Sequence, residues 1–175
     1  MRPDHPNSGV PGRKSANIYP LGIETRLGPE LEAHIRAQEN LCARLEALAD
    51  GLPDKIDRQI CLHLARQIGA VVKKAHRFEE GLLFPLLRGR AIGDESLAQT
   101  LTRLQYEHFE DEAYADELAE ALTGFVTGSG RPNAETLGYM LRGFFEAMRR
   151  HLAFEREHLL PLLSTPQAGS PVHAA

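Results

Sequence analysis

The sequence predicts an all-α protein that folds as an up-down-up-down antiparallel four-helix bundle. Apolar residues recur at helical spacing in four long stretches between about residues 28 and 163. Within this region the only prolines after residue 29 are Pro53, Pro85, Pro132 and Pro161, and helix interiors tolerate proline badly. Alternating runs of β-branched residues, which would indicate strands, are absent from the sequence. Because the connections are short, helices that follow one another should run antiparallel.

The first predicted helix spans about residues 28–50 and stops at Gly51, a residue type common at helix ends. Its apolar side is formed by Leu31, Ile35, Leu41, Cys42, Leu45 and Leu48. The second predicted helix spans about residues 54–88 and starts near Asp54. Its apolar side is formed by Ile60, Leu64, Ile68, Val72, Leu83 and Leu87.

The third predicted helix spans about residues 94–124, with Asp94 or Ser96 as its N-cap and Gly124 as its stop. Its inward stripe consists of Leu97, Leu101, Leu104, His108, Ala115, Leu118 and Leu122. The fourth predicted helix spans about residues 133–163, with Asn133 as its N-cap. Its inward stripe consists of Leu137, Leu141, Phe144, Met148, His151, Glu155 and Leu162.

The two ends of the chain differ from this helical region. Residues 1–27 and 164–175 are rich in Pro, Gly, Ser and Asn, which predicts an N-terminal leader and a disordered tail around one domain, 28–163. A net charge of −4 argues against partners such as nucleic acid or an anionic membrane. The chain also lacks the apolar core of a signal peptide, so we expect a cytoplasmic protein. Cys42 and Cys61 are expected to be buried small hydrophobic residues, with a thiol pair as the alternative.

The second and fourth predicted helices share a short sequence pattern that contains candidate functional residues. His76 is followed by Glu80 and then Pro85, and His151 is followed by Glu155 and then Pro161. Residues four apart share a helix face, so each segment presents an imidazole and a carboxylate to one point. The first and third helices add further polar residues to the apolar stripes: His34, His108 and, one turn after His108, Glu112.

The histidines of the four helices lie at one depth in the bundle. With a rise of about 1.5 Å per residue, all four fall within a slab about 10 Å thick. A single histidine on an apolar face is more often a hydrogen-bonded core residue, but four histidines and two glutamates at one depth favour a metal site over a metal-free bundle. Nitrogen and oxygen ligands suit iron or manganese, with zinc possible. The predicted ligands are His34, His76, Glu80, His108, His151 and Glu155, with Glu79, Glu112 and His158 as possible additional ligands.

Together these pieces resemble a hemerythrin-like domain of the group often called HHE cation-binding. The resemblance covers about residues 28–163. It implies a non-haem centre of two iron ions, oxo- or hydroxo-bridged. In this arrangement His34 and His76 serve one iron, His108 and His151 serve the other, and Glu80 and Glu155 bridge them.

Two departures from the family pattern bear on function. Pro85 follows His76 by nine residues whereas Pro161 follows His151 by ten, which leaves open whether Glu80 or Glu79 bridges. Oxygen-carrying members have a second histidine where this chain has Glu112, which argues against reversible oxygen carriage.

The leading hypothesis is therefore a di-iron protein that binds or reacts with a small diatomic, O2 or NO, or with peroxide. The alternatives are repair of iron–sulfur clusters and an iron or oxygen sensor that acts through a protein partner.

Overall fold

The computed structural model describes residues 24–90, 92–129 and 132–164, and in these ranges all regular structure is helical. The first long helix is α1, Glu24–Gly51. The second consists of α2, Arg58–Phe78, the π-helical turn η1, Glu79–Leu83, and α3, Phe84–Arg90. The third is α4, Glu95–Thr127. The fourth consists of α5, Ala134–Phe154, the π-helical turn η2, Glu155–Leu159, and α6, Leu160–Ser164. The predicted all-α fold is confirmed.

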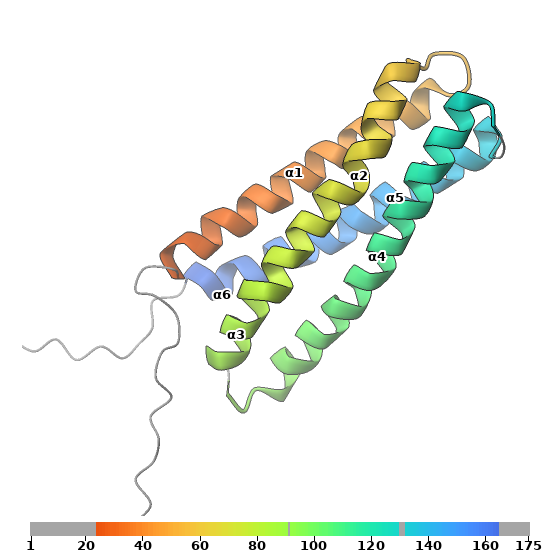
Figure 1. The fold of residues 1–175 in the computed structure, drawn as a ribbon. Helices are drawn as coiled ribbons and strands as arrows, with labels where there is room; N and C mark the ends of the chain where they lie inside the picture. The colour runs from red at the N-terminus through yellow and green to blue at the C-terminus, as the bar shows by residue number, and fades with distance from the viewer. Residues whose placement is uncertain (1–23, 91, 130–131, 165–175) are drawn as a thin grey trace, which may run out of the picture.

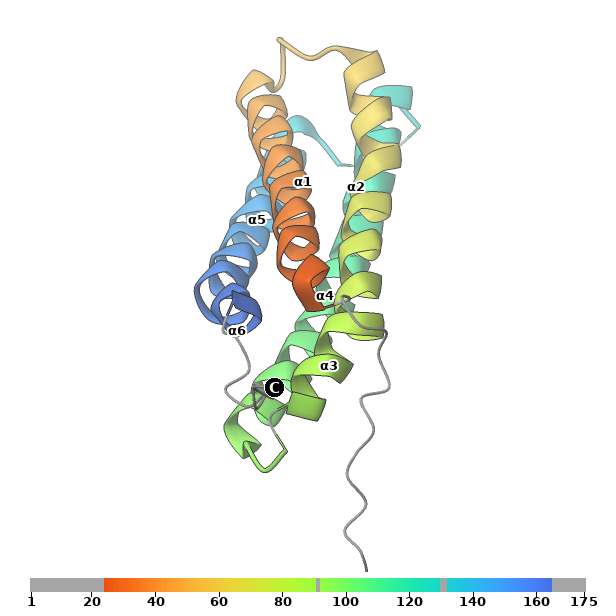
Figure 2. The same cartoon turned by 90° about the vertical axis from the view of Figure 1, so that its left-hand side faces the viewer.

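The four long helices lie side by side (Figure 1). Helix α1 packs against α2 and α5, and α4 packs against the same two helices from the other side, as the turned view shows (Figure 2). The α1–α2 and α4–α5 connections lie at one end of the molecule, and the connection from α3 to α4 lies at the other (Figure 1). Within the described ranges, no helix is long and apolar enough to cross a membrane.

Side-chain caps set most of the helix starts. Asp94 accepts a hydrogen bond from the Leu97 amide at 3.0 Å, and Asn133 accepts one from the Thr136 amide at 2.8 Å, so both predicted N-caps are confirmed. The second helix begins later than predicted. Its cap is Asp57, whose carboxylate accepts hydrogen bonds from two amides of the first turn, and not Asp54.

The helix ends depart from the sequence prediction in two places. Gly124 does not end α4, which continues to Thr127 and stops at Gly128, where φ is +69°. A left-handed backbone is easy for glycine, and this explains why the helix stops there. Helix α1 already begins at Glu24, inside the predicted leader. The remainder of the leader, residues 1–23, and residues 165–175 of the predicted tail lie outside the described residues.

The two π-helical turns explain where the second and fourth helices place their glutamates. In each turn an amide donates to a carbonyl five residues back, Phe84 to Glu79 and Leu160 to Glu155. A proline follows each turn, and its ring would crowd the carbonyl four residues earlier in a regular α-helix. The wider turn relieves this crowding. Each π turn begins at a fully buried glutamate.

The apolar stripes predicted from the sequence form one continuous core. Ile60 and Leu162 are exceptions, because both lie close to helix ends and are exposed. Cys42 and Cys61 are buried free thiols, which confirms their interpretation as small core residues.

Candidate metal centre

A cluster of ionisable side chains interrupts the apolar core. Among the described residues, the buried polar or charged ones are Gln38, His76, Glu79, His108, His151 and Glu155. Ligand atoms within 4.8 Å of one another form two overlapping sets. One set contains His76, His108 and His151, and the other contains Glu79, His108, His151 and Glu155. Five side chains from three of the long helices thus converge on one region of the core.

The imidazole rings of the cluster are in direct contact. The His76 and His108 rings stack with centroids 3.9 Å apart, and the His151 ring lies across His108 at 5.3 Å. Two inward nitrogens approach the glutamates of the π turns. His151 Nε2 lies 2.9 Å from Glu155 Oε1, and His108 Nε2 lies 3.2 Å from Glu79 Oε2.

An outer carboxylate contacts Nδ1 of each histidine. The Nδ1 atoms of His76, His108 and His151 lie 3.1, 2.7 and 3.3 Å from carboxylate oxygens. Their respective partners are Glu112, Glu80 and Glu107. A carboxylate that accepts a hydrogen bond from Nδ1–H leaves the Nε2 lone pair free to bind a cation. The three outer carboxylates therefore fix the orientation of the three imidazole rings.

Electrostatics of the buried groups favour binding of cations. Burial, with the neighbouring histidines, lowers the pKa of His76 to about 2, and burial also lowers the pKa of His108. Burial next to the Glu155 carboxylate raises the pKa of Glu79 well above its usual range. Burial disfavours the charged form of His151, but the nearby carboxylates of Glu155, Asp111 and Glu107 together outweigh this and raise its pKa. The neutral imidazoles of His76 and His108, and a carboxyl group that releases its proton when a cation binds, are suited to metal binding.

Unpaired polar atoms give an independent test of whether a metal fits. Nε2 of His76 and of His108, both oxygens of Glu79 and Oε2 of Glu155 are buried without a hydrogen-bond partner. An orphaned buried polar group costs about 1–3 kcal/mol. Two or more cations with nitrogen and oxygen ligands would satisfy these atoms together. The donor set contains no thiolate and suits iron or manganese, and zinc as well.

The structure places the sequence-predicted residues at two levels. His76, His108, His151 and Glu155 lie in the inner cluster, together with Glu79, which was predicted only as a possible additional ligand. Glu80 is 39% exposed and contacts the outer side of His108, while Glu112 contacts the outer side of His76.

His34 and His158 lie outside the inner cluster. His34 is half-buried against the Phe78 ring, with centroids 4.9 Å apart. His158 is exposed and packs on Phe154. His63, on the second long helix, is exposed.

Two residues near the cluster were not predicted as site residues. Glu107 precedes His108 in the sequence and contacts His151 instead, across the α4–α5 interface. Gln38 lies one turn after His34 on α1, and a neutral amide gives no metal-ligand signal in a sequence. The sequence signal that could have identified Gln38 is its position as a polar residue within an apolar stripe.

A groove between α4 and α5 reaches the cluster. It has a volume of about 340 Å³ and its lining includes His151, Glu107, Asp111, Arg103 and Arg150. Burial raises the pKa of Asp111 to about 6. This groove gives a small molecule or a cation a route from solvent to the His151 side of the cluster.

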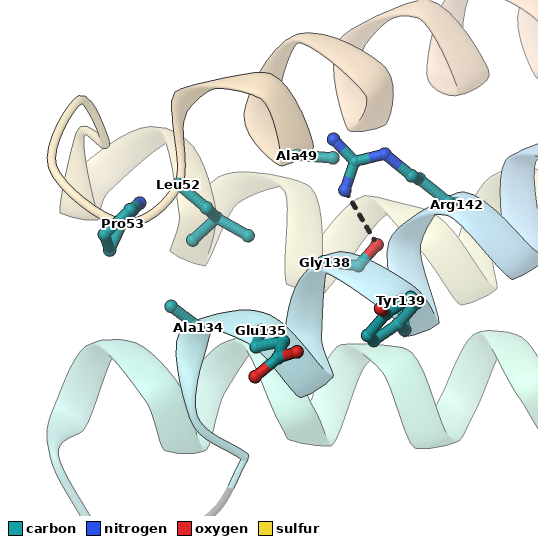
Figure 3. Close-up of a pocket in the computed structure, with 8 residues that line it drawn as sticks. All are labelled: Ala49, Leu52, Pro53, Ala134, Glu135, Gly138, Tyr139 and Arg142. Carbon is teal, nitrogen blue, oxygen red and sulfur yellow. Dashed lines mark hydrogen bonds between the residues drawn. The ribbon is translucent and has the colours of Figure 1, made fainter.

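A larger pocket of about 520 Å³ lies at the other end of the bundle, where α1 ends and α5 begins (Figure 3). Its cation, Arg142, donates to the Gly138 carbonyl and to the Asp50 carboxylate. Its lining contains neither histidine nor cysteine, so the metal-ligand chemistry lies in the cluster and not in this pocket.

Comparison with protein families gives one match. The family described as hemerythrin HHE cation binding domain matches residues 29–163, which include every residue of the cluster and the outer carboxylates. Searches of curated proteins and of solved structures find no significant match.

Proposed function

The chain belongs to the hemerythrin HHE cation-binding family, and from this premise we propose that it is a non-haem di-iron protein that reacts with a small oxidant. The oxidant is O2, NO or peroxide. We also propose that consecutive long helices run antiparallel, so that the bundle around the centre has an up-down-up-down arrangement. The observation that carries the proposal is the set of buried, unpaired nitrogen and oxygen atoms on His76, Glu79, His108 and Glu155.

The proposed inner ligands are the five residues of the cluster, His76, Glu79, His108, His151 and Glu155. We assign the bridging positions to Glu79 and Glu155, because both are fully buried and their carboxyl groups interact. Glu80 then has the role of orienting His108. His34 remains a proposed sixth ligand, since a change of its side-chain rotamer from the Phe78 ring would turn it toward the core.

A bound iron pair supplies redox chemistry toward small oxidants. The protein contributes the surroundings: apolar side chains such as Phe84 exclude bulk water, and the outer carboxylates hold the imidazole Nδ1 protons. The groove beside His151 leads from the surface to the edge of the cluster.

Glu112 supports reaction over reversible carriage. It stands where oxygen carriers of the family have a histidine, and its carboxylate adds negative charge 3.1 Å from His76 Nδ1. This negative charge would favour the higher oxidation state of an iron held by His76, and would thus disfavour reversible binding.

Anaerobic reconstitution with Fe²⁺ tests the proposal. We expect two iron ions per chain, near-ultraviolet absorption after exposure to air, and no return of the starting spectrum when air is removed. Alanine at His76 or His151 should reduce iron content sharply, whereas His63→Ala, on the exposed face of α2, should not. Equal iron content in all three variants would overturn the ligand assignment, and a visible band that disappears under vacuum would indicate a carrier.

A further inference from the structure

The Gln38 side chain is a buried amide without a partner. The residue is 1% exposed, and neither its Oε1 nor its Nε2 makes a hydrogen bond. A primary amide has two N–H donors and a carbonyl acceptor, and its burial without partners is unfavourable. Two explanations of such a residue are available. Either a bound molecule forms hydrogen bonds with the amide, or packing of the core requires the shape of the side chain.

Packing does not require an amide at this position. Gln38 lies at the centre of the inward face of α1, between Leu31 and Leu45, seven residues away on either side and both fully buried. Its flanking core residues Ile35 and Cys42 are also buried and apolar. Leucine or methionine would fill a comparable volume there without an unsatisfied group.

Contacts along α1 place Gln38 level with the metal cluster. Its sequence neighbour Glu39 forms an ion pair with Arg156, the sequence neighbour of Glu155. The side chains of Gln38 and Glu155, both buried, therefore enter the core at about the same height. Two contacts set the height against α2: the ring contact of His34 with Phe78, and the hydrogen bond from Arg44 to Gln67.

The two contacts between α1 and α2 place Gln38 opposite residues 73–74 of α2, which lie less than one helical turn from His76. Glu155 Oε2 and His76 Nε2 also lack hydrogen-bond partners, so neither is bonded to the Gln38 amide. Unpaired groups from α1, α2 and η2 thus border the same part of the core.

We propose that Gln38 is a specificity-determining residue, whose amide donates a hydrogen bond to the small molecule that the metal centre binds. The inference rests on the proposed function. An N–H donor at this place stabilises anions and other strong hydrogen-bond acceptors, of which azide is a convenient probe. It adds little for NO, a weak acceptor. The centre should therefore select ligands by their capacity to accept a hydrogen bond as well as by size.

The test compares azide binding in the iron-loaded full-length chain with that of Gln38→Met, which keeps length and flexibility but removes the amide. Optical titration should show an azide dissociation constant about tenfold higher in the variant, the usual size of one lost hydrogen bond. Iron content and NO binding should be unchanged. Gln38→Leu, which also fills the volume without an amide, should weaken azide binding to the same extent.

A matched control and a second readout separate this role from a structural one. Leu45→Met also introduces a methionine, seven residues away in the same stripe, but removes no amide, and it should leave azide affinity unchanged. In metal-free protein, Gln38→Met should raise the melting temperature relative to wild type, because it removes a buried unpaired amide.

Three results would overturn the inference. Equal azide affinity in iron-loaded wild type and Gln38→Met would overturn it alone. Loss of iron in Gln38→Met would make Gln38 a metal ligand instead. A wild-type chain that binds no iron would overturn the proposed function, and this inference with it.

Discussion

The two halves of the bundle differ in the kind of side chain that they bury. The half near the α1–α2 connection is filled by apolar side chains such as Leu45, Leu64, Leu122 and Leu141. The half that contains the cluster buries five ionisable side chains and most of the unpaired polar atoms among the described residues. Burial of apolar surface stabilises both halves, since the second half also buries side chains such as Leu31, Leu83 and Phe84, but there cations or protons must offset the buried polar groups as well. The apolar half thus contributes to stability alone, whereas the other half also contains the candidate metal ligands.

The largest expected effect tests the apolar half. Phe144 is buried there, with its ring edge-on to Tyr114 at 5.5 Å, and Phe144→Ala should cost about 3–5 kcal/mol of unfolding free energy. Because the cavity is remote from the cluster, the loss measured by chemical denaturation should be equal in metal-free and metal-loaded protein. A loss confined to the metal-loaded form would show that the two halves are not separate in energy.

Metal removal tests the other half. A ligand that binds only the native state at a hundred times its dissociation constant adds about 2.7 kcal/mol. For a domain of this size, that corresponds to a rise in melting temperature of about 5–10 °C. Calorimetry of the reconstituted and chelator-treated protein should show this difference, and superimposable melting curves would contradict a site inside the core.

Removal of an outer carboxylate should have a smaller effect. Glu112→Ala takes away the partner of His76 Nδ1 and should weaken metal affinity about 10–100-fold, as measured by competition with a chelator. The control is Glu117→Ala, a change to an exposed residue on the same helix. If both variants bind metal like wild type, the Nδ1 contacts do not orient the ligands.

The smallest effect is a dependence of stability on pH that arises from Asp111, beside the cluster. The pKa of Asp111 in the folded protein is raised to about 6, so the folded form holds this proton more tightly than the unfolded chain does. The resulting stability is present below about pH 4 and is lost as the pH rises through 6. Asp111→Asn should therefore raise the melting temperature of metal-free protein more at pH 7.5 than at pH 5.

The matched change Glu120→Gln, at an exposed position further along α4, should change the melting temperature of the metal-free protein by the same amount at the two pH values. A gain for Asp111→Asn that does not change with pH would mean that its carboxyl group titrates normally.

Periodicity and caps made most of the fold predictable from the sequence. The stripes identified the four long helices, and Asp94 and Asn133 marked two of their starts. Gly124 was mistaken for a helix end because glycine tolerates helical as well as left-handed backbone, and packing of Phe125 and Val126 on the core carries α4 onward.

The candidate site was largely predictable from the regular helical period. His76, His108, His151 and Glu155 meet as their spacing suggested. Glu79 lies three residues after His76 and Glu80 four, so both fit the helical period, and the structure places Glu79 in the cluster and Glu80 on its outer side. The distance to proline contained the missing information, since Glu79 and Glu155 each precede a proline by six residues. The position of Glu107 depends on contacts between helices, which a single sequence does not contain.

The π turn at Glu79–Leu83 also couples the length of its helix to the site. Successive residues of an α-helix are rotated by about 100°, so the extra residue in the wide turn offsets the phase of everything that follows it. Deletion of Gly81, whose surroundings are open, would allow the turn to rewind as regular helix. The phase of α3 would then change by about 100°, and Phe84 and Leu87 would leave the core. The surplus residue therefore keeps Leu87 in the core, together with Phe84, whose ring stacks on that of His108.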